Sequence, residues 1–174
     1  MTPNGVSPPF ALFAVVELDQ KVINDILEKA KSTSSVNDLW LLSGSDYSDA
    51  PQKGHRKVNT GTDPPISDSF KSPFTGRKLS DLVQWLQAKP ENVDLDDHYF
   101  AILDRKAEAP SESVVLCKIG DIDLQGDTVT CFRVEATSAS SFLSGMEYGE
   151  WEEMREGTHK KPFAEIDYGD SEEA

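Results

Sequence analysis

The stretch FALFAVVELDQKVINDILEKAK, residues 10–31, contains the pattern that decides the fold. Its first part, residues 10–18, is rich in Phe and Val, which favours a strand, although a helix fits so short an apolar run as well. In the second part, Asp19 can cap a helix whose apolar residues recur at the spacing of one buried face: Ile23, Ile26, Leu27 and Ala30. The stretch therefore predicts a strand followed by a helix over residues 20–31.

The same patterns continue along the chain and predict alternating strands and helices. Residues 38–43 and 98–103 are short, almost wholly apolar runs, which are typical of strands buried on both faces of a sheet. Residues 79–89 repeat the helical spacing and end before a proline. Residues 113–120 and 127–136 indicate an antiparallel hairpin. We expect an α/β fold with a mixed sheet of about five strands flanked by helices.

The hairpin is predicted to turn at residues 125–126, because every cross-strand pair facing the core is then apolar. In this register Cys117 faces Val134, whereas Cys131 faces Gly120 on the opposite side of the sheet. A disulfide needs Cα atoms within about 7 Å and converging Cβ atoms. We therefore expect the two cysteines to be unbonded and to lie on different faces.

The regular pattern suggests one domain with irregular ends. Residues 1–9 are rich in Pro, Gly and Ser and are expected to form a flexible N-terminus. The domain then covers residues 10–156 and ends, after the hairpin, in a helical region over residues 139–156 that two glycines break. Residues 157–174 are expected to form an acidic tail.

A long loop, residues 43–77, interrupts the alternation. Its 35 residues exceed the length of about 12–15 residues beyond which loops are uncommon in compact domains. Together with Lys78 it contains six basic and four acidic residues, a net charge of +2 in a chain of net charge −14. Two interpretations remain open: a solvated insertion that lies back on the acidic body, or a loop that covers a ligand or a partner.

Charge and cysteine content limit the function classes. The 174 residues include 31 acidic and 17 basic side chains, and this excess of negative charge argues against nucleic acid and anionic lipid as partners. The longest apolar run, residues 10–16, is shorter than the about 20 residues of a membrane-spanning helix. Only two cysteines and no signal-peptide pattern occur, so we expect a cytoplasmic protein.

Five short motifs follow one another along residues 38–156: LLSGSDYSD at 41–49, DHYFAILD at 97–104, VVLCK at 114–118, FRVE at 132–135 and EWEEM at 150–154. This order resembles an uncharacterised domain family of small acidic bacterial and fungal proteins. The resemblance implies a strand with an acidic end, a helix, a buried strand ending in Asp, a hairpin and a broken acidic helix. It implies no activity, and the long loop and the N-terminal strand and helix depart from the family pattern.

Sequence motifs for phosphate loops, dinucleotide binding, serine hydrolases and zinc sites are absent, and no cofactor or resident metal is expected. One group of polar residues is a candidate catalytic site. If the strands at 38–43 and 98–103 are parallel and adjacent, Asp46 and Asp104 meet at one sheet edge under the loop that carries His55. Such a group can perform acid/base chemistry or hold Mg²⁺. The alternative is that each aspartate only caps a turn.

The surrounding polar residues are candidate binding residues: Asp49, Arg56, Lys57 and Arg105. Two functions follow from these observations. The first is an acidic intracellular interaction module that binds the surface of a basic protein. The alternative is a small cofactor-independent enzyme of metabolism, including secondary metabolism, that acts on a small molecule at Asp46 and Asp104 under the loop at 43–77.

Overall fold

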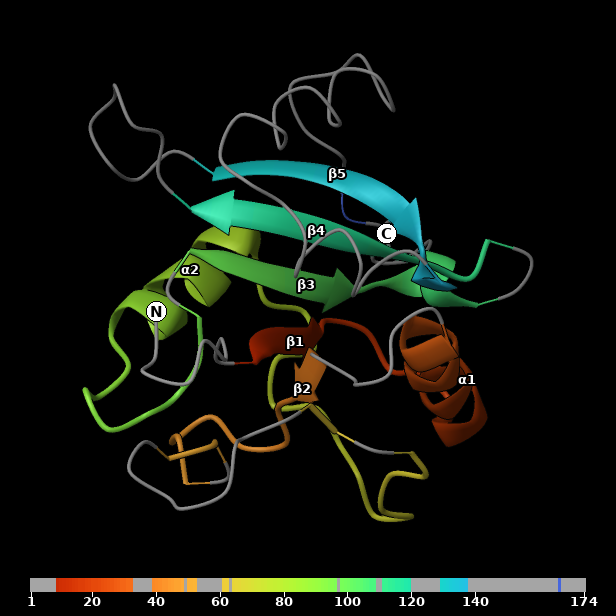
Figure 1. Cartoon of the computed structure of the whole chain (residues 1–174), viewed down its shortest axis with the longest axis horizontal. Coiled ribbons are helices and arrows are strands. Elements are labelled where there is room, and N and C mark those ends of the chain that lie inside the picture. Colours follow the sequence, from red (N-terminus) through yellow and green to blue (C-terminus); the bar gives the residue numbers. More distant parts are fainter. Residues whose placement is uncertain are drawn as a thin grey trace.

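The computed structural model describes residues 9–32, 39–48, 50–52, 61–62, 64–96, 98–108, 111–119, 129–137 and 166. Strands and helices alternate in the first half of the chain (Figure 1). In chain order the elements are β1 (Phe10–Ala14), α1 (Gln20–Ser32), β2 (Leu39–Leu41), α2 (Leu79–Gln87), β3 (Tyr99–Leu103), the 3₁₀ turn η1 (Arg105–Ala107), β4 (Ser113–Ile119) and β5 (Val129–Glu135).

One mixed sheet contains all five strands in the order β2-β1-β3-β4-β5. β1 pairs in parallel with both β2 and β3, whereas β4 pairs antiparallel with β3 and β5. The predicted fold class, an α/β domain with a mixed sheet of about five strands and an antiparallel hairpin, is therefore confirmed. The broken helix expected at 139–156 lies outside the described residues, and the predicted domain limits stay predictions.

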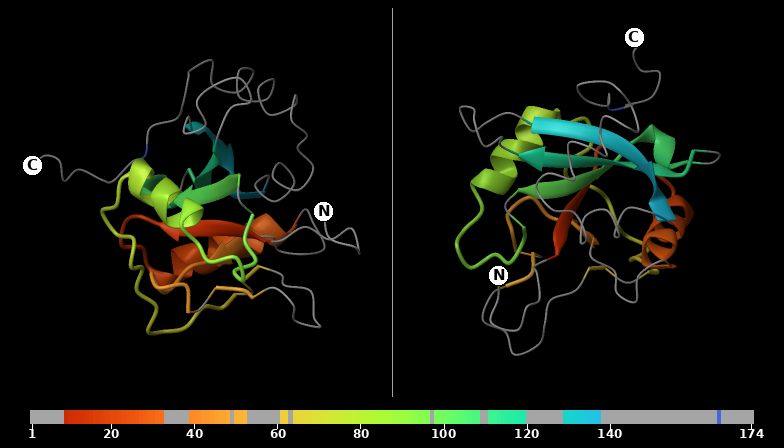
Figure 2. Two further views of the ribbon diagram at one scale, coloured as in Figure 1. Left: turned by 90° about the vertical axis from the view of Figure 1, so that its left-hand side faces the viewer. Right: turned by 45° about the horizontal axis from the view of Figure 1, so that its top comes forward.

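The two helices cover opposite faces of the sheet (Figure 2). Alternate residues of β1 supply both faces: Phe10, Leu12 and Ala14 lie on the α1 side, and Ala11 and Phe13 lie on the α2 side. Every residue of β1 is buried, which explains why its sequence is a continuous apolar run rather than an alternating one.

Each helix buries the side-chain stripe that its spacing predicts. In α1 the four predicted residues are buried, and in α2 Leu82, Val83 and Leu86 are buried. Burying one of the Leu, Ile or Val side chains of these stripes stabilises the fold by about 1.5–3 kcal/mol. At the start of α2 the Asp81 carboxylate accepts a hydrogen bond from the backbone nitrogen of Lys78 at 3.2 Å. No helix among the described residues combines the length and apolar character needed to cross a membrane.

The register of the β4–β5 hairpin differs from the prediction by three residues. Cys117 lies directly opposite Cys131, and Arg133 lies opposite Val115. The prediction placed a tight turn at 125–126, whereas nine residues, 120–128, connect the two strands. Because the shift is odd, it moves every β5 side chain to the other face. The expectation that the cysteines lie on different faces is therefore wrong, although both are free, as expected.

A buried ion pair gives the physical reason for this register. It brings the guanidinium of Arg133 within 2.6 Å of the carboxylate of Asp104, which has 0% relative exposure. An unpaired buried carboxylate costs several kcal/mol. The observed register supplies its partner and still places apolar residues opposite one another, as at Val114–Val134 and Leu116–Phe132.

The described parts of the long loop lie against the domain. The backbone nitrogen of Thr62 donates to Leu39, and its hydroxyl accepts from the nitrogen of Leu41, both at 2.8 Å, along the outer edge of β2. Phe74 is buried on the α2 side, and Ile66 and Phe70 pack partly buried on the α1 side. The described parts of this insertion therefore contribute to both cores.

Candidate functional site

β1 and β3 are neighbours in the sheet, but the chain leaves β1 towards one edge of the sheet and leaves β3 towards the other edge. From β1 the chain passes through α1 to β2 on one side, and from β2 it passes through α2, on the opposite face, to β3 on the other side of β1. In open α/β sheets, ligands bind outside the carboxyl ends of the strands at such a topological switch point. The residues that follow β1 and β3 therefore occupy the position at which such sheets bind ligands.

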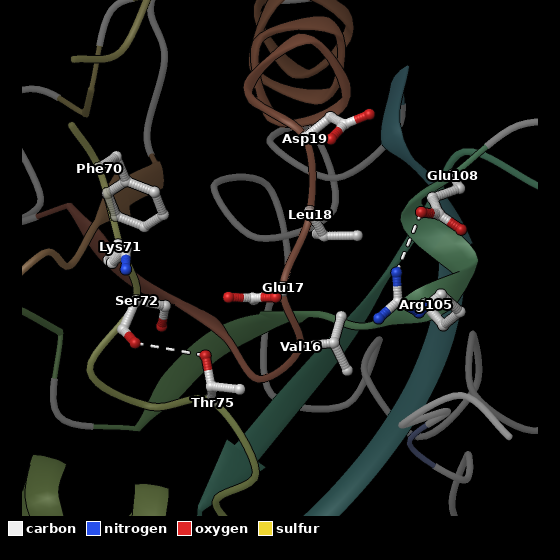
Figure 3. A pocket seen from close by; sticks show the side chains of 10 residues that line it. All are labelled: Val16, Glu17, Leu18, Asp19, Phe70, Lys71, Ser72, Thr75, Arg105 and Glu108. Carbon is white, nitrogen blue, oxygen red and sulfur yellow. Dashed lines mark hydrogen bonds and ion pairs between the residues drawn. The ribbon is translucent and has the colours of Figure 1, made fainter. Parts of the chain in front are cut away.

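A hollow of about 550 Å³ lies at this point, and we call it the switch-point hollow (Figure 3). Three segments line it: the connection from β1 to α1, a part of the long loop, and the turn after β3. Their lining residues are Val16, Glu17, Leu18 and Asp19; Phe70, Lys71, Ser72 and Thr75; and Arg105 and Glu108. Its volume falls within the about 300–1,000 Å³ of typical small-molecule sites.

Hydrogen bonds fix the loop wall to the end of β1. The backbone nitrogen of Gly76 donates to the carbonyl of Val15 at 2.8 Å, and the hydroxyl of Ser72 donates to the carbonyl of Ala14 at 2.5 Å. Gly76 has a φ of +80°, which favours glycine at this bend. These contacts hold residues 70–76 beside the strand end.

The opposite wall begins at Asp104. Its carboxylate accepts a hydrogen bond from the backbone nitrogen of Lys106 at 3.1 Å and so caps the turn η1. The guanidinium of Arg105, at the rim, lies 3.1 Å from the carboxylate of Glu108, and both side chains are more than one-third exposed. Ala107 is buried behind them among the residues that face α1.

Asp104 itself is a structural residue. Two nitrogens of Arg133 contact its two carboxylate oxygens at 3.0 and 2.6 Å, and one of these nitrogens also lies 3.2 Å from the hydroxyl of Ser113. Fork-shaped pairing of this kind is strong and directional. It fixes edge strand β5 to the turn that forms one wall of the hollow.

The expected pairing of Asp46 with Asp104 rested on adjacent strands, and this expectation is wrong because β1 lies between β2 and β3. Asp46 is exposed and accepts hydrogen bonds from the hydroxyl and backbone nitrogen of Ser48 at 2.7 and 3.1 Å. These bonds lower the pKa of Asp46 below its usual value. Both aspartates thus cap turns, which is the alternative that the sequence left open.

The remaining candidates divide into two groups. Arg105 lines the hollow. The three loop candidates His55, Arg56 and Lys57, together with Asp49, lie outside the described residues.

Sequence reasoning missed Glu17, Asp19 and Lys71. Glu17 and Asp19 lie in the connection from β1 to α1, within five residues of the end of β1, so the rule for carboxyl ends of strands, applied to β1, would have pointed to both. Lys71 stands in an irregular loop, and no local pattern distinguishes it from the other loop lysines.

The charges of the hollow favour a polar ligand with a cationic group. Three carboxylates and two cations line it, and Arg105 is already paired with Glu108. The hydroxyls of Ser72 and Thr75 donate to backbone carbonyls, which engages both in holding the loop wall. Within the described part of the chain, no three His, Cys, Asp or Glu side chains are grouped so that they could hold a metal ion.

Comparison of the chain with known proteins found no matching family model, no similar curated protein and no similar solved structure.

Proposed function

We propose that the protein binds a small polar molecule with a positively charged amine in the switch-point hollow. The observation that carries this proposal is the hollow itself, with an excess of carboxylates, at the carboxyl ends of β1 and β3. The proposed small-molecule site therefore lies at the ends of β1 and β3, whereas the sequence had placed it at Asp46 and Asp104, after β2 and β3. The proposal concerns binding and includes no reaction.

The amine is assigned from the direction of Glu17. Its side chain is exposed, and Figure 3 shows its carboxylate pointing across the hollow towards the loop wall. A charge-assisted hydrogen bond from an ammonium group to a carboxylate is about twice as strong as a neutral one. Lys71, in the loop wall, is placed to contact an acidic group of the same ligand, so amino acids and related zwitterions fit best.

Calorimetric titration tests the proposal with a panel of L-lysine, L-ornithine, glycine and putrescine, each compared with its N-acetylated form. We expect saturable binding of one or more free amines and at least about tenfold weaker binding after acetylation, because a charge-assisted contact is lost. Equal affinity for free and acetylated ligands would contradict the proposal.

Matched variants locate the contact. Glu17→Gln removes the charge in the hollow, whereas Glu91→Gln removes an exposed charge at another place on the fold. We expect about tenfold weaker amine binding for the first variant and unchanged binding for the second. Equal amine affinities of the two variants would show that Glu17 does not contact the ligand.

We propose recognition of a basic protein surface as a second candidate, which the distribution of charge favours. The chain has a net charge of −14, and its acidic residues are concentrated at the C-terminal end. Residues 147–174 alone contribute −7. Such a concentration of charge steers cationic partners, and a cytoplasmic location is part of this proposal.

A lysine-rich peptide serves as the probe for this candidate. We expect association at about 50 mM salt that weakens steeply towards 300 mM, because exposed charges are screened by salt. Shortening the chain to residue 146 removes the net charge of −7 and should also reduce the association. Association that is insensitive to salt or to the truncation would argue against this candidate.

A further inference from the structure

Cys117 and Cys131 form a closely spaced pair of thiols in the hairpin. They lie directly opposite each other on β4 and β5, their sulfur atoms are 3.1 Å apart, and both are free. Directly opposite residues of antiparallel strands have Cα atoms about 4.5–5.5 Å apart, which falls within the range of disulfides. A bond between the two sulfurs therefore requires no change of register.

We propose that Cys117 and Cys131 form a reversible disulfide in response to a small peroxide, and that this bond ties edge strand β5 to β4. The site is independent of the proposed ligand and lies in a different part of the sheet. Two thiols at this distance in a chain with no other cysteine can react only with each other within the molecule.

The reaction is balanced with hydrogen peroxide as the oxidant. One cysteine, as the thiolate, attacks the peroxide, the O–O bond breaks, and a sulfenic acid and hydroxide form. The sulfur of the second cysteine then attacks the sulfenic sulfur, the S–S bond forms, the S–O bond breaks, and water leaves. In total, two thiols and one peroxide yield one disulfide and two waters, and a dithiol reverses the change by exchange.

Burial controls when the pair reacts. Cys117 and Cys131 have relative exposures of 0% and 1%, so β5 must open before peroxide enters. β5 stands at the end of the strand order and pairs with β4 alone among the described strands, and opening at such an edge is a local event.

The rate is also expected to depend on pH. Burial raises the pKa of the Cys117 thiol, and the neighbouring Cys131 and the negative charge of Asp104 raise it further. On this face α2 contributes the apolar side chains of Leu82, Val83 and Leu86. Arg133, two residues after Cys131 on the same face, is charged and pairs with Asp104. Since the thiolate is the reactive form, oxidation is expected to be faster as the pH rises from 7 to 9.

The bond would stabilise the hairpin. It closes a loop of 15 residues, for which chain entropy predicts an increase in Tm of about 5–10 °C in a protein of this size. β5 also carries Arg133, which holds Asp104 at one wall of the switch-point hollow. The disulfide would therefore fix the strand that anchors this wall.

The direct test uses the full chain, reduced, freed of reductant and treated with hydrogen peroxide. We expect loss of both free thiols, a mass lower by two hydrogens, a linked peptide containing Cys117 and Cys131, and a Tm increase that dithiothreitol reverses. Retention of two free thiols after treatment, or oxidation to sulfinic acid without a linked peptide, would overturn the proposal.

Single substitutions provide the control. Cys117→Ala and Cys131→Ala leave one thiol each, so peroxide is expected to leave their Tm unchanged in the monomer. A Tm increase in either variant equal to that of the unchanged protein would show that the stabilisation does not come from this disulfide.

Discussion

Asp104 and Arg105 are neighbours in the chain, yet they occupy opposite environments. Asp104 is fully buried and its two carboxylate oxygens are held by Arg133, whereas Arg105 is about one-third exposed and pairs with Glu108 at the rim of the switch-point hollow. A buried charge with a fork-shaped partner is part of the fold, because losing the partner leaves the charge without solvation. An exposed charge beside a hollow can exchange its partner for a ligand at little cost.

Removing the buried cation should have the largest effect. Arg133→Met leaves Asp104 buried without its main partner, and we expect the free energy of unfolding to fall by about 3–5 kcal/mol. The matched variant Arg105→Met should change it by at most about 1 kcal/mol, because its ion pair is exposed to solvent. Urea unfolding of both variants measures this contrast, and equal losses would remove the distinction between the two regions.

A double substitution sharpens the interpretation of that loss. Combining Arg133→Met with Asp104→Asn removes the unpaired charge and retains a side-chain oxygen to cap η1. We expect the double variant to recover more than half of the stability lost in Arg133→Met, because most of the cost is the buried carboxylate. If the double variant is less stable than Arg133→Met, the loss comes from packing instead.

The buried cysteine predicts a smaller, pH-dependent effect. The pKa of Cys117 is higher in the folded chain than in the unfolded chain, so the folded state favours the protonated thiol. Its stabilising contribution is complete below the unfolded pKa of about 8.5 and decreases as the pH rises above it, by at most about 1.4 kcal/mol per pH unit. Unfolding curves of the reduced protein between pH 8 and 10 should show a slope that Cys117→Ala reduces, and identical slopes would contradict this.

The smallest effect is expected at Asp46, the exposed member of the two aspartates that the sequence singled out. Its pKa is lowered by hydrogen bonds from Ser48, but water can replace those bonds. Asp46→Asn should shift Tm at pH 7 by less than about 2 °C. Calorimetry of this variant and of Arg133→Met under the same conditions measures both Tm shifts. A larger shift for Asp46→Asn would show that the exposed fraction of a charged side chain does not predict its contribution to stability in this protein.

Local patterns predicted the elements, because their causes are local. The apolar run at β1 and the buried stripes of α1 and α2 follow from the sequence alone, and the structure confirms them. The hairpin register was missed because it depends on a contact between residues that are distant in sequence. Arg133 reaches the carboxylate of Asp104 when it lies opposite Val115.

The candidate site was missed for a related reason. The rule that ligands bind at the carboxyl ends of parallel strands was applied to the strands before Asp46 and Asp104, but β1 lies between them. Strand order is set by which apolar faces pack together, and no single segment contains this information. Lys71 joins the site only because the loop returns to the end of β1 through Gly76.

The central claim is that the switch-point hollow, and not the region of Asp46, is the ligand site. Backbone amide NMR of the full chain during titration with the tightest-binding free amine tests it most directly. We predict saturable shifts concentrated in residues 16–19, 70–75 and 105–108, which are lost in Glu17→Gln. Shifts centred on residues 46–48 instead, or no saturable shifts with any amine of the panel, would contradict the account.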